Sequence, residues 1–370
     1  MRILQILPSL VNGGVESETV DTVKAITDAG GKAYVASAGG LLVEKIIANG
    51  GVHIELPLKT KSPLSVYCNI SKLQKIIRDH QIQLVHARSR APAWSAYYAA
   101  KRENVPFVTT YHGAYGMKGW GKKKYNQVML KGDRIMVPSQ FITHHLKKNY
   151  FFDQRKLRTV PSGIDTTYFD PITISAKQAA IQKKDWGAPA GNTILLMPGR
   201  LSRIKGCDVA IEALAALKKR NVSLVFVGAV GNTYEQELAK RAKELNLQDH
   251  VFFCPPSQNM PLTYAAADII ISASRKPESF GRTIVEAQAM GKPIIATKHG
   301  GAVELISHER TGWLIQPEEP QKLARTLKKM MELSPKALED ITTHARDVVT
   351  HTYTANIMGQ KTIAVYRELL

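Results

Sequence analysis

The chain has 370 residues, of which 44% are hydrophobic and 22% are charged. These shares are ordinary for folded soluble proteins and argue against long disorder, collagen-like repeats or a coiled coil, while the length predicts two domains. The formal net charge of +19 predicts an anionic partner: a nucleic acid, a membrane surface or a phosphorylated substrate.

Short apolar segments alternate with longer amphipathic segments along nearly the whole chain, which is typical of strand-helix-strand units around a parallel sheet. In the first half, strands are predicted at Arg2–Leu7, Lys32–Ser37, His53–Leu56, Gln83–Ala87, Phe107–Tyr111, Arg134–Val137 and Arg158–Pro161. In the second half, they are predicted at Thr193–Met197, Ser223–Val227, Val251–Cys254, Asp268–Ser272 and Pro293–Ala296. We therefore expect an α/β protein with two Rossmann-like, doubly wound domains.

The domain boundary is placed between Asp165 and Ala190, where Pro, Gly and polar residues mix without a sustained strand. This placement predicts an N-terminal domain over residues 1–175 and a C-terminal domain over residues 186–350. Residues 351–370 are predicted to be helical and partly amphipathic, and their spacing leaves open which domain they pack against.

The cysteines indicate the redox compartment of the protein, and the apolar segments indicate how it can contact a membrane. Cys68, Cys207 and Cys254 are far apart and show no C-x-x-C spacing, so we expect no disulfide framework, no zinc site and a reducing compartment. The N-terminal apolar run is broken by Pro8 and is too short for a signal peptide. No apolar run approaches the roughly 20 residues that cross a bilayer, so any membrane contact is expected to be peripheral.

Positive charge is concentrated in the first half of the chain. Residues 1–185 carry a net charge of +14, against +5 for residues 186–370, and residues 101–160 alone carry +10. This stretch includes a basic segment with an aromatic residue, Lys118, Trp120, Lys122, Lys123 and Lys124. We expect an anionic surface or acceptor to meet it, although blocks of like charge are often only a solvated face.

Gly13 and Gly14 stand where the first strand ends and a helix begins. Glycines there let a ligand approach the backbone, and the helix start offers free N–H groups to a phosphate or a sugar hydroxyl. The spacing matches neither the dinucleotide-binding G-x-G-x-x-G pattern nor a P-loop. A donor-binding loop and a plain turn are both compatible with it.

Arg200 and Lys205 follow the first strand of the second half and precede a helix. Open parallel sheets bind ligands at the carboxyl ends of their strands. A guanidinium can clamp phosphate oxygens with two hydrogen bonds, and an ammonium can act as a point charge on a leaving group. The pair is therefore predicted to bind a diphosphate, with solvated loop cations as the alternative.

Two glutamates eight residues apart flank a glycine after the strand Asp268–Ser272. One carboxylate can accept hydrogen bonds from sugar hydroxyls and the other from the ribose hydroxyls, while N–H groups at the helix start face the phosphates. The plainer interpretation is that one glutamate caps the helix and the other lies on the surface. The nearby cations Arg200 and Lys205 favour a sugar-nucleotide site instead. The candidate donor-binding residues are Glu278, Ser279, Phe280, Gly281, Thr283 and Glu286.

These motifs together resemble the retaining glycosyltransferases of family 4, which have the GT-B architecture and include bacterial lipopolysaccharide-core, mannosyl and glucosyl transferases. The matching segments occur in the family's order: Gly13–Glu16, Tyr111–Gly113, Val137–Ser139, Val160–Asp165, Gly199–Leu201 with Lys205–Gly206, Glu278 with Glu286, and Gly300–Gly301 with Glu304. The resemblance implies two Rossmann-like domains that face each other across a cleft, with the final helix crossing back to the first domain.

The resemblance also implies roles for individual residues. Arg200 and Lys205 would bind the donor diphosphate, Glu286 the ribose, and Glu278 with the backbone of residues 279–281 the transferred sugar. His112 would lie near the reacting centre. The implied reaction is front-face substitution with retention, without a cofactor or metal, since cations offset the charge of the leaving diphosphate and no D-x-D motif occurs.

The implied acceptor is a lipopolysaccharide core or another anionic glycolipid. The stretch His86–Trp94 resembles acceptor-side sequence of core transferases, and its Arg88 and Arg90 are expected to meet phosphates or acidic sugars. The basic segment at 117–125 is expected to dock on anionic lipid, which places a cytoplasmic protein on the inner face of the membrane.

Two alternatives remain open from the sequence. A sugar-nucleotide epimerase or a phosphorylase would share the GT-B architecture. Nucleic-acid binding is suggested by the basic composition, but no zinc-finger spacing, RNP-like strand or basic zipper accompanies it. We therefore expect no nucleic-acid partner.

Overall fold

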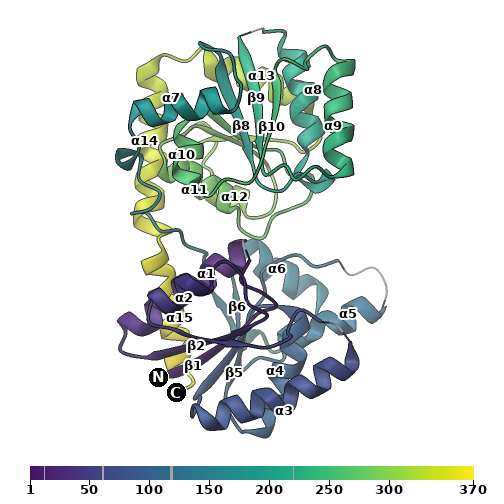
Figure 1. Ribbon diagram of the computed structural model, residues 1–370, viewed down its shortest axis with the longest axis vertical. Helices are drawn as coiled ribbons and strands as arrows, with labels where there is room; N and C mark the ends of the chain where they lie inside the picture. The colour runs from purple at the N-terminus through teal and green to yellow at the C-terminus, as the bar shows by residue number, and fades with distance from the viewer. Residues whose placement is uncertain (12, 61, 117–119, 220) are drawn as a thin grey trace. The chain divides into compact units, whose positions relative to one another are not determined.

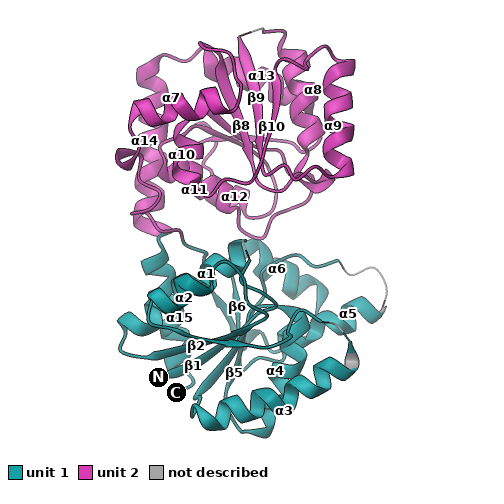
Figure 2. Cartoon of the chain, in the orientation of Figure 1, with its two compact units in different colours: residues 1–163, 354–370 teal, residues 164–353 magenta. Residues whose placement is uncertain are grey.

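The computed structural model describes residues 1–11, 13–60, 62–116, 120–219 and 221–370, and these divide into two compact units (Figure 1). Figure 2 shows unit 1, residues 1–163 with 354–370, and unit 2, residues 164–353. Each unit is a parallel sheet with helices on both faces. The predicted α/β class with two doubly wound sheets is confirmed.

Unit 1 has, in its described part, seven parallel strands in the order β3-β2-β1-β4-β5-β6-β7. The strands are β1 (Arg2–Ile6), β2 (Lys32–Ser37), β3 (Val52–Glu55), β4 (Leu84–Ala87), β5 (Phe107–Thr110), β6 (Arg134–Val137) and β7 (Leu157–Thr159). The helices are α1 (Gly14–Asp28), α2 (Val43–Ala48), α3 (Pro63–Asp79), α4 (Arg90–Arg102), α5 (Trp120–Asn126), α6 (Gln140–Asn149) and α15 (Ala355–Arg367).

Unit 2 repeats this plan over its described residues, with six parallel strands in the order β10-β9-β8-β11-β12-β13. The strands are β8 (Thr193–Pro198), β9 (Val222–Val227), β10 (Val251–Cys254), β11 (Ile269–Ser272), β12 (Ile294–Thr297) and β13 (Trp313–Ile315). The helices are α7 (Ala176–Asp185), α8 (Cys207–Leu217), α9 (Thr233–Glu244), α10 (Met260–Ala265), α11 (Arg282–Ala289), α12 (Ala302–Leu305), α13 (Pro320–Met331) and α14 (Pro335–Thr352).

The apolar strands of both sheets are buried on both faces. In β1, Leu4 and Ile6 pack into the core on one side, while Ile3 packs into the core on the other. In β8, Leu195 and Leu196 likewise belong to opposite cores. Successive side chains of a strand point to opposite faces, so a sheet covered by helices on both sides needs unbroken apolar runs such as these.

The unit boundary lies at residues 163 and 164, earlier than the predicted boundary region. Ile164, Phe169 and Trp186 are buried in the core of unit 2, and α7 occupies much of the segment that the sequence analysis treated as irregular. None of the residues of α7 is fully buried, so its sequence is mostly polar. It therefore lacks the apolar periodicity from which a helix is predicted.

The last helix, α15, returns to unit 1 and packs beside α1, where Gly359 lies against Ala25. The chain leaves unit 2 at Tyr353, and the Thr354 side chain caps α15 by accepting a hydrogen bond from the Ile357 N–H. In the described part of the chain, no helix combines the length and apolar character that crossing a bilayer requires.

Candidate functional site

The strand order of unit 2 reverses between β8 and β11, which lie side by side at the centre of the sheet. Chain connections leave these two strands in opposite directions, which opens a crevice at their carboxyl ends where α/β proteins bind ligands. Lys205 lies in the loop after β8 and Glu278 in the loop after β11. The topology therefore brings together two predicted site residues that are distant in sequence.

Lys205 and Glu278 form an ion pair, with the Lys205 Nζ 2.6 Å from the Glu278 Oε1. The Ser274 hydroxyl donates a hydrogen bond to the same carboxylate oxygen. Burial raises the pKa of Glu278, but the ammonium of Lys205, the Ser274 hydroxyl and the nearby His299 together hold it below its ordinary value. The carboxylate is thus charged at neutral pH, and one cation and one anion share the crevice.

Glycines bring these loops into close contact. Gly206 has a positive φ of 69°, and a Cβ at this position would lie 2.2 Å from the carbonyl oxygen of Ala273. Only glycine combines this conformation with such an approach. On the other side, the Gly301 N–H donates to the Glu278 carbonyl, so the loop after β12 supports the loop that carries Glu278.

Glu286 lies within α11, where two side chains hold its carboxylate. The Tyr264 hydroxyl donates a hydrogen bond of 2.8 Å to Oε2, and the Arg282 Nε lies 3.3 Å from Oε1. Phe280 turns its ring into the core of unit 2, so only its backbone is available to a ligand. Ser279 and Thr283 are partly buried on either side of Gly281, the N-cap residue that precedes α11.

A small hollow lies beside Glu278. Gly281, Thr297 and His299 are among its lining residues. The His299 Nε2 donates to the Ser274 carbonyl at 2.8 Å, which leaves Nδ1 as a buried acceptor without a partner among the described residues. Arg200 lies on the exposed stretch that follows β8. The predicted donor-binding residues of unit 2, Arg200 included, therefore follow the carboxyl ends of its strands at one end of the sheet.

In unit 1, Gly13 and Gly14 begin α1 as predicted, and His112 follows β5. His112 is nearly buried, and its Nδ1 lies 3.5 Å from the Glu18 Oε2 of α1. Burial foremost lowers the pKa of His112 to about 4, with a smaller raising effect from Glu18 and a lowering effect from Arg88. The imidazole is therefore neutral near pH 7.

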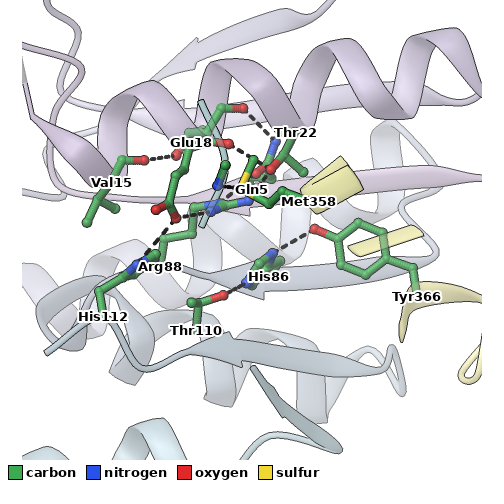
Figure 3. A network of polar contacts seen from close by, with 12 residues as sticks. Gln5, Val15, Glu18, Thr22, His86, Arg88, Thr110, His112, Met358 and Tyr366 are labelled. Carbon is green, nitrogen blue, oxygen red and sulfur yellow. Dashed lines mark hydrogen bonds and ion pairs between the residues drawn. The ribbon is translucent and has the colours of Figure 1, made fainter. Parts of the chain in front are cut away.

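The structure corrects the prediction that Arg88 meets an acceptor. Its side chain is 3% exposed, and it donates hydrogen bonds to Gln5 and Thr22 inside unit 1 (Figure 3). A guanidinium enclosed in this way does not reach an anionic surface. Arg90 is also held, since it donates to Asn126 and stacks 3.8 Å above the centre of the Tyr115 ring, but it remains partly exposed.

The predicted basic segment forms α5 of unit 1. Lys122, Lys123 and Lys124 are exposed on this helix. Trp120 begins the helix, but its side chain and residues 117–119, including Lys118, lie outside the described residues. The Lys123 Nζ lies 5.6 Å from the centre of the Tyr150 ring, and the next residue, Phe151, is fully exposed.

Comparison with known proteins places these features in a family. Residues 12–168 match Glycosyltransferase Family 4, and residues 178–348 match Glycosyl transferases group 1. The solved structure of a glycosyltransferase from Rickettsia africae ESF-5 is 35% identical, with a TM-score of 0.90 over 100% of this chain and 98% of that one. The chain belongs to the group 1 glycosyltransferases of family 4.

This family 4 chain is also similar to D-inositol 3-phosphate glycosyltransferase from Salinispora arenicola, at 29% identity over 67% of this chain and 60% of that protein. It thus spans about 60% of the length of that curated relative. Anabaena HepE, solved with UDP-glucose, shows the same fold, with a TM-score of 0.88 at 23% identity over the full length of both chains.

Sequence analysis missed several residues around the family 4 site. Ser274 and Tyr264 hold the two glutamates, and Glu18 lies against His112. Ser274 stands only four residues before Glu278, so its position after a buried strand was an available signal. Tyr264 and Glu18 gave no such signal in the sequence, because their partners are remote along the chain and contact them only through packing of the folded chain.

Proposed function

We propose that this chain is a retaining hexosyltransferase that moves a hexose from a UDP-linked sugar to an anionic acceptor. The Lys205–Glu278 pair at the reversal of the strand order is the observation that carries the proposal. An ammonium suited to a phosphate and a carboxylate suited to sugar hydroxyls meet at one point, as a sugar diphosphate requires. UDP-glucose in the structure of HepE supports the uridine donor.

In this proposal, Arg200 and Lys205 hold the diphosphate and stabilise the charge that develops as it leaves. Glu278 and the backbone of residues 279–281 orient the hexose, and Glu286 accepts hydrogen bonds from the ribose. The acceptor oxygen bonds to the anomeric carbon on the face from which the diphosphate oxygen departs. Attack on this face retains the anomeric configuration, and the proton of the acceptor hydroxyl passes to the departing phosphate. His112 would act near the reacting centre.

The proposed reaction needs no metal or other cofactor, because the two cations supply the positive charge at the leaving group. Turnover that persists in excess chelator is the expected behaviour. Loss of turnover in chelator, followed by recovery on addition of a divalent ion, would contradict this part of the proposal.

The proposed acceptor is an anionic glycolipid, such as a lipopolysaccharide core, met at the inner face of the cytoplasmic membrane. The exposed lysines of α5 and the partly exposed Arg90 support an anionic partner. The Salinispora relative is named for D-inositol 3-phosphate, a phosphorylated compound. This name agrees with an acceptor that carries negative charge.

Thermal unfolding in the presence of nucleotides tests the donor. A ligand present at 100 times its dissociation constant adds about 2.7 kcal/mol of stability. We expect UDP and UDP-hexoses to raise Tm, and GDP, ADP and CMP to raise it less. Mass spectrometry should then detect a glycosylated acceptor. Free isomerised sugar or sugar phosphate as the product would indicate an epimerase or a phosphorylase and overturn the proposal.

A further inference from the structure

Glu18 and His112 form a close, enclosed pair inside unit 1. Glu18 comes from the second turn of α1 and His112 from the segment after β5, and Figure 3 shows the two side chains pointing toward each other. The Glu18 Oε2 lies 3.5 Å from the His112 Nδ1, and the two side chains are 8% and 9% exposed. Water is therefore largely excluded from the contact, which strengthens the interaction.

Arg88 holds Glu18 from the opposite side. Its Nη1 lies 3.9 Å from the same Glu18 oxygen, while its Nε donates to Gln5 at 2.7 Å and its Nη2 donates to Thr22. Two elements, β1 and α1, thus hold the guanidinium that faces Glu18. A carboxylate braced in this way has little freedom to turn from His112.

The pair determines which ring nitrogen of His112 carries the proton. A carboxylate oxygen accepts hydrogen bonds and does not donate them, so its position favours the tautomer with hydrogen on Nδ1. In a neutral ring, Nε2 then holds a lone pair. This Nε2 is buried and has no hydrogen-bond partner among the described residues, and a buried unsatisfied nitrogen is costly unless it serves a ligand.

We propose that Glu18 is a positioning residue that fixes the Nδ1–H tautomer of His112, so that Nε2 accepts a hydrogen bond from a substrate hydroxyl. The inference rests on the proposed function, because it takes His112 as a group near the reacting centre. It also gives Arg88 a role: the arginine supports Glu18 from within the unit and does not contact the acceptor.

The ¹⁵N resonances of the His112 ring in the wild-type protein test the tautomer directly, with His112→Gln to assign them. We expect a protonated, pyrrole-type Nδ1 and an unprotonated, pyridine-type Nε2. A proton on Nε2 in the wild type would overturn the proposal without any variant at position 18.

Glu18→Gln is the informative variant, because its amide can either donate or accept and so no longer selects a tautomer. We expect mixed tautomers and a kcat lowered about 10- to 100-fold, the range found for groups that orient metal-binding histidines. UDP-induced thermal stabilisation should stay unchanged, since unit 2 holds the proposed diphosphate site. Glu18→Asp, which keeps the charge, should recover part of the loss.

Asp28→Asn is the matched control, because Asp28 is an exposed acid of the same helix, paired with Lys24, and should leave kcat unchanged. If Glu18→Gln keeps the wild-type tautomer and a kcat within twofold, the positioning role is wrong. If His112→Gln itself keeps wild-type turnover, the proposed role of His112 fails instead. The two failures are thus distinguished.

Discussion

At the scale of single residues, Lys205 helps to keep the Glu278 carboxyl ionised. Without the ammonium, only the Ser274 hydroxyl and His299 still offset the burial of Glu278, so the pKa of this carboxyl should rise. We expect Lys205→Ala to lower kcat about 100- to 1,000-fold, the effect of removing one preorganised electrostatic contact. The acidic limb of its pH–kcat profile should also lie at higher pH than in the wild type. Steady-state kinetics between pH 5 and 8 measure both effects.

Lys240→Ala provides the comparison for this variant, because Lys240 is an exposed lysine of α9 in the same unit. It should match the wild type in kcat and in pH profile. An unshifted acidic limb in Lys205→Ala would show that Glu278 does not depend on Lys205 for its charge.

At the scale of elements, α5 is the helix whose charge is proposed to meet a membrane. Each lysine near an anionic surface contributes about 1 kcal/mol, so replacing Lys122, Lys123 and Lys124 with alanine should weaken vesicle binding about 100-fold or more. Sedimentation with vesicles containing phosphatidylglycerol measures this binding. Raised salt should weaken the wild-type interaction, because screening shortens the reach of the charges.

A triple alanine variant of exposed lysines in unit 2, Lys177, Lys184 and Lys240, removes the same charge elsewhere. It should bind vesicles nearly as well as the wild type. Equal losses in the two variants would mean that net charge, and no particular face, governs binding. If vesicle binding of the wild-type protein does not change with salt concentration, the contact is not electrostatic.

At the scale of the whole molecule, buried histidines link the stability of unit 1 to pH. His86 is fully buried between Tyr366 and Thr110, and burial holds its pKa well below the ordinary 6.5, with smaller contributions from Arg88 and His112. The unfolded chain takes up protons below pH 6.5 and the folded unit does not, so stability falls as the solution is acidified. For His112 alone, a pKa of about 4 implies a loss of about 2 kcal/mol between pH 7 and 5.

Thermal unfolding followed by circular dichroism at pH 7 and pH 5 should therefore show a lower Tm at pH 5. His112→Gln removes one of the titrating groups, so it should lose less stability over the same pH change. An equal loss in this variant would contradict the pKa assigned to His112.

Much of the fold and part of the site could be predicted from local sequence. Apolar runs specified the central strands, and Gly13 and Gly281 marked two helix starts, because strand burial and close turns restrict the residues that can occupy them. The short strand β13 and the polar helix α7 were missed, since neither has a strong pattern. Lys205 and Glu278 were selected in two separate motifs, and the topology, once the strands are ordered, brings their loops together.

Arg88 shows what local sequence does not contain. Its position after a strand is as compatible with an exposed ligand-binding arginine as with the enclosed one that the structure reveals. The amino-acid sequence alone determined the strand-turn-helix units and the chemical types placed at their ends. Tertiary structure alone decided which remote side chains meet, as Glu18 meets His112 and Tyr264 meets Glu286. Burial and partner choice depend on helices packing across a sheet, whereas strand and turn preferences act between near neighbours.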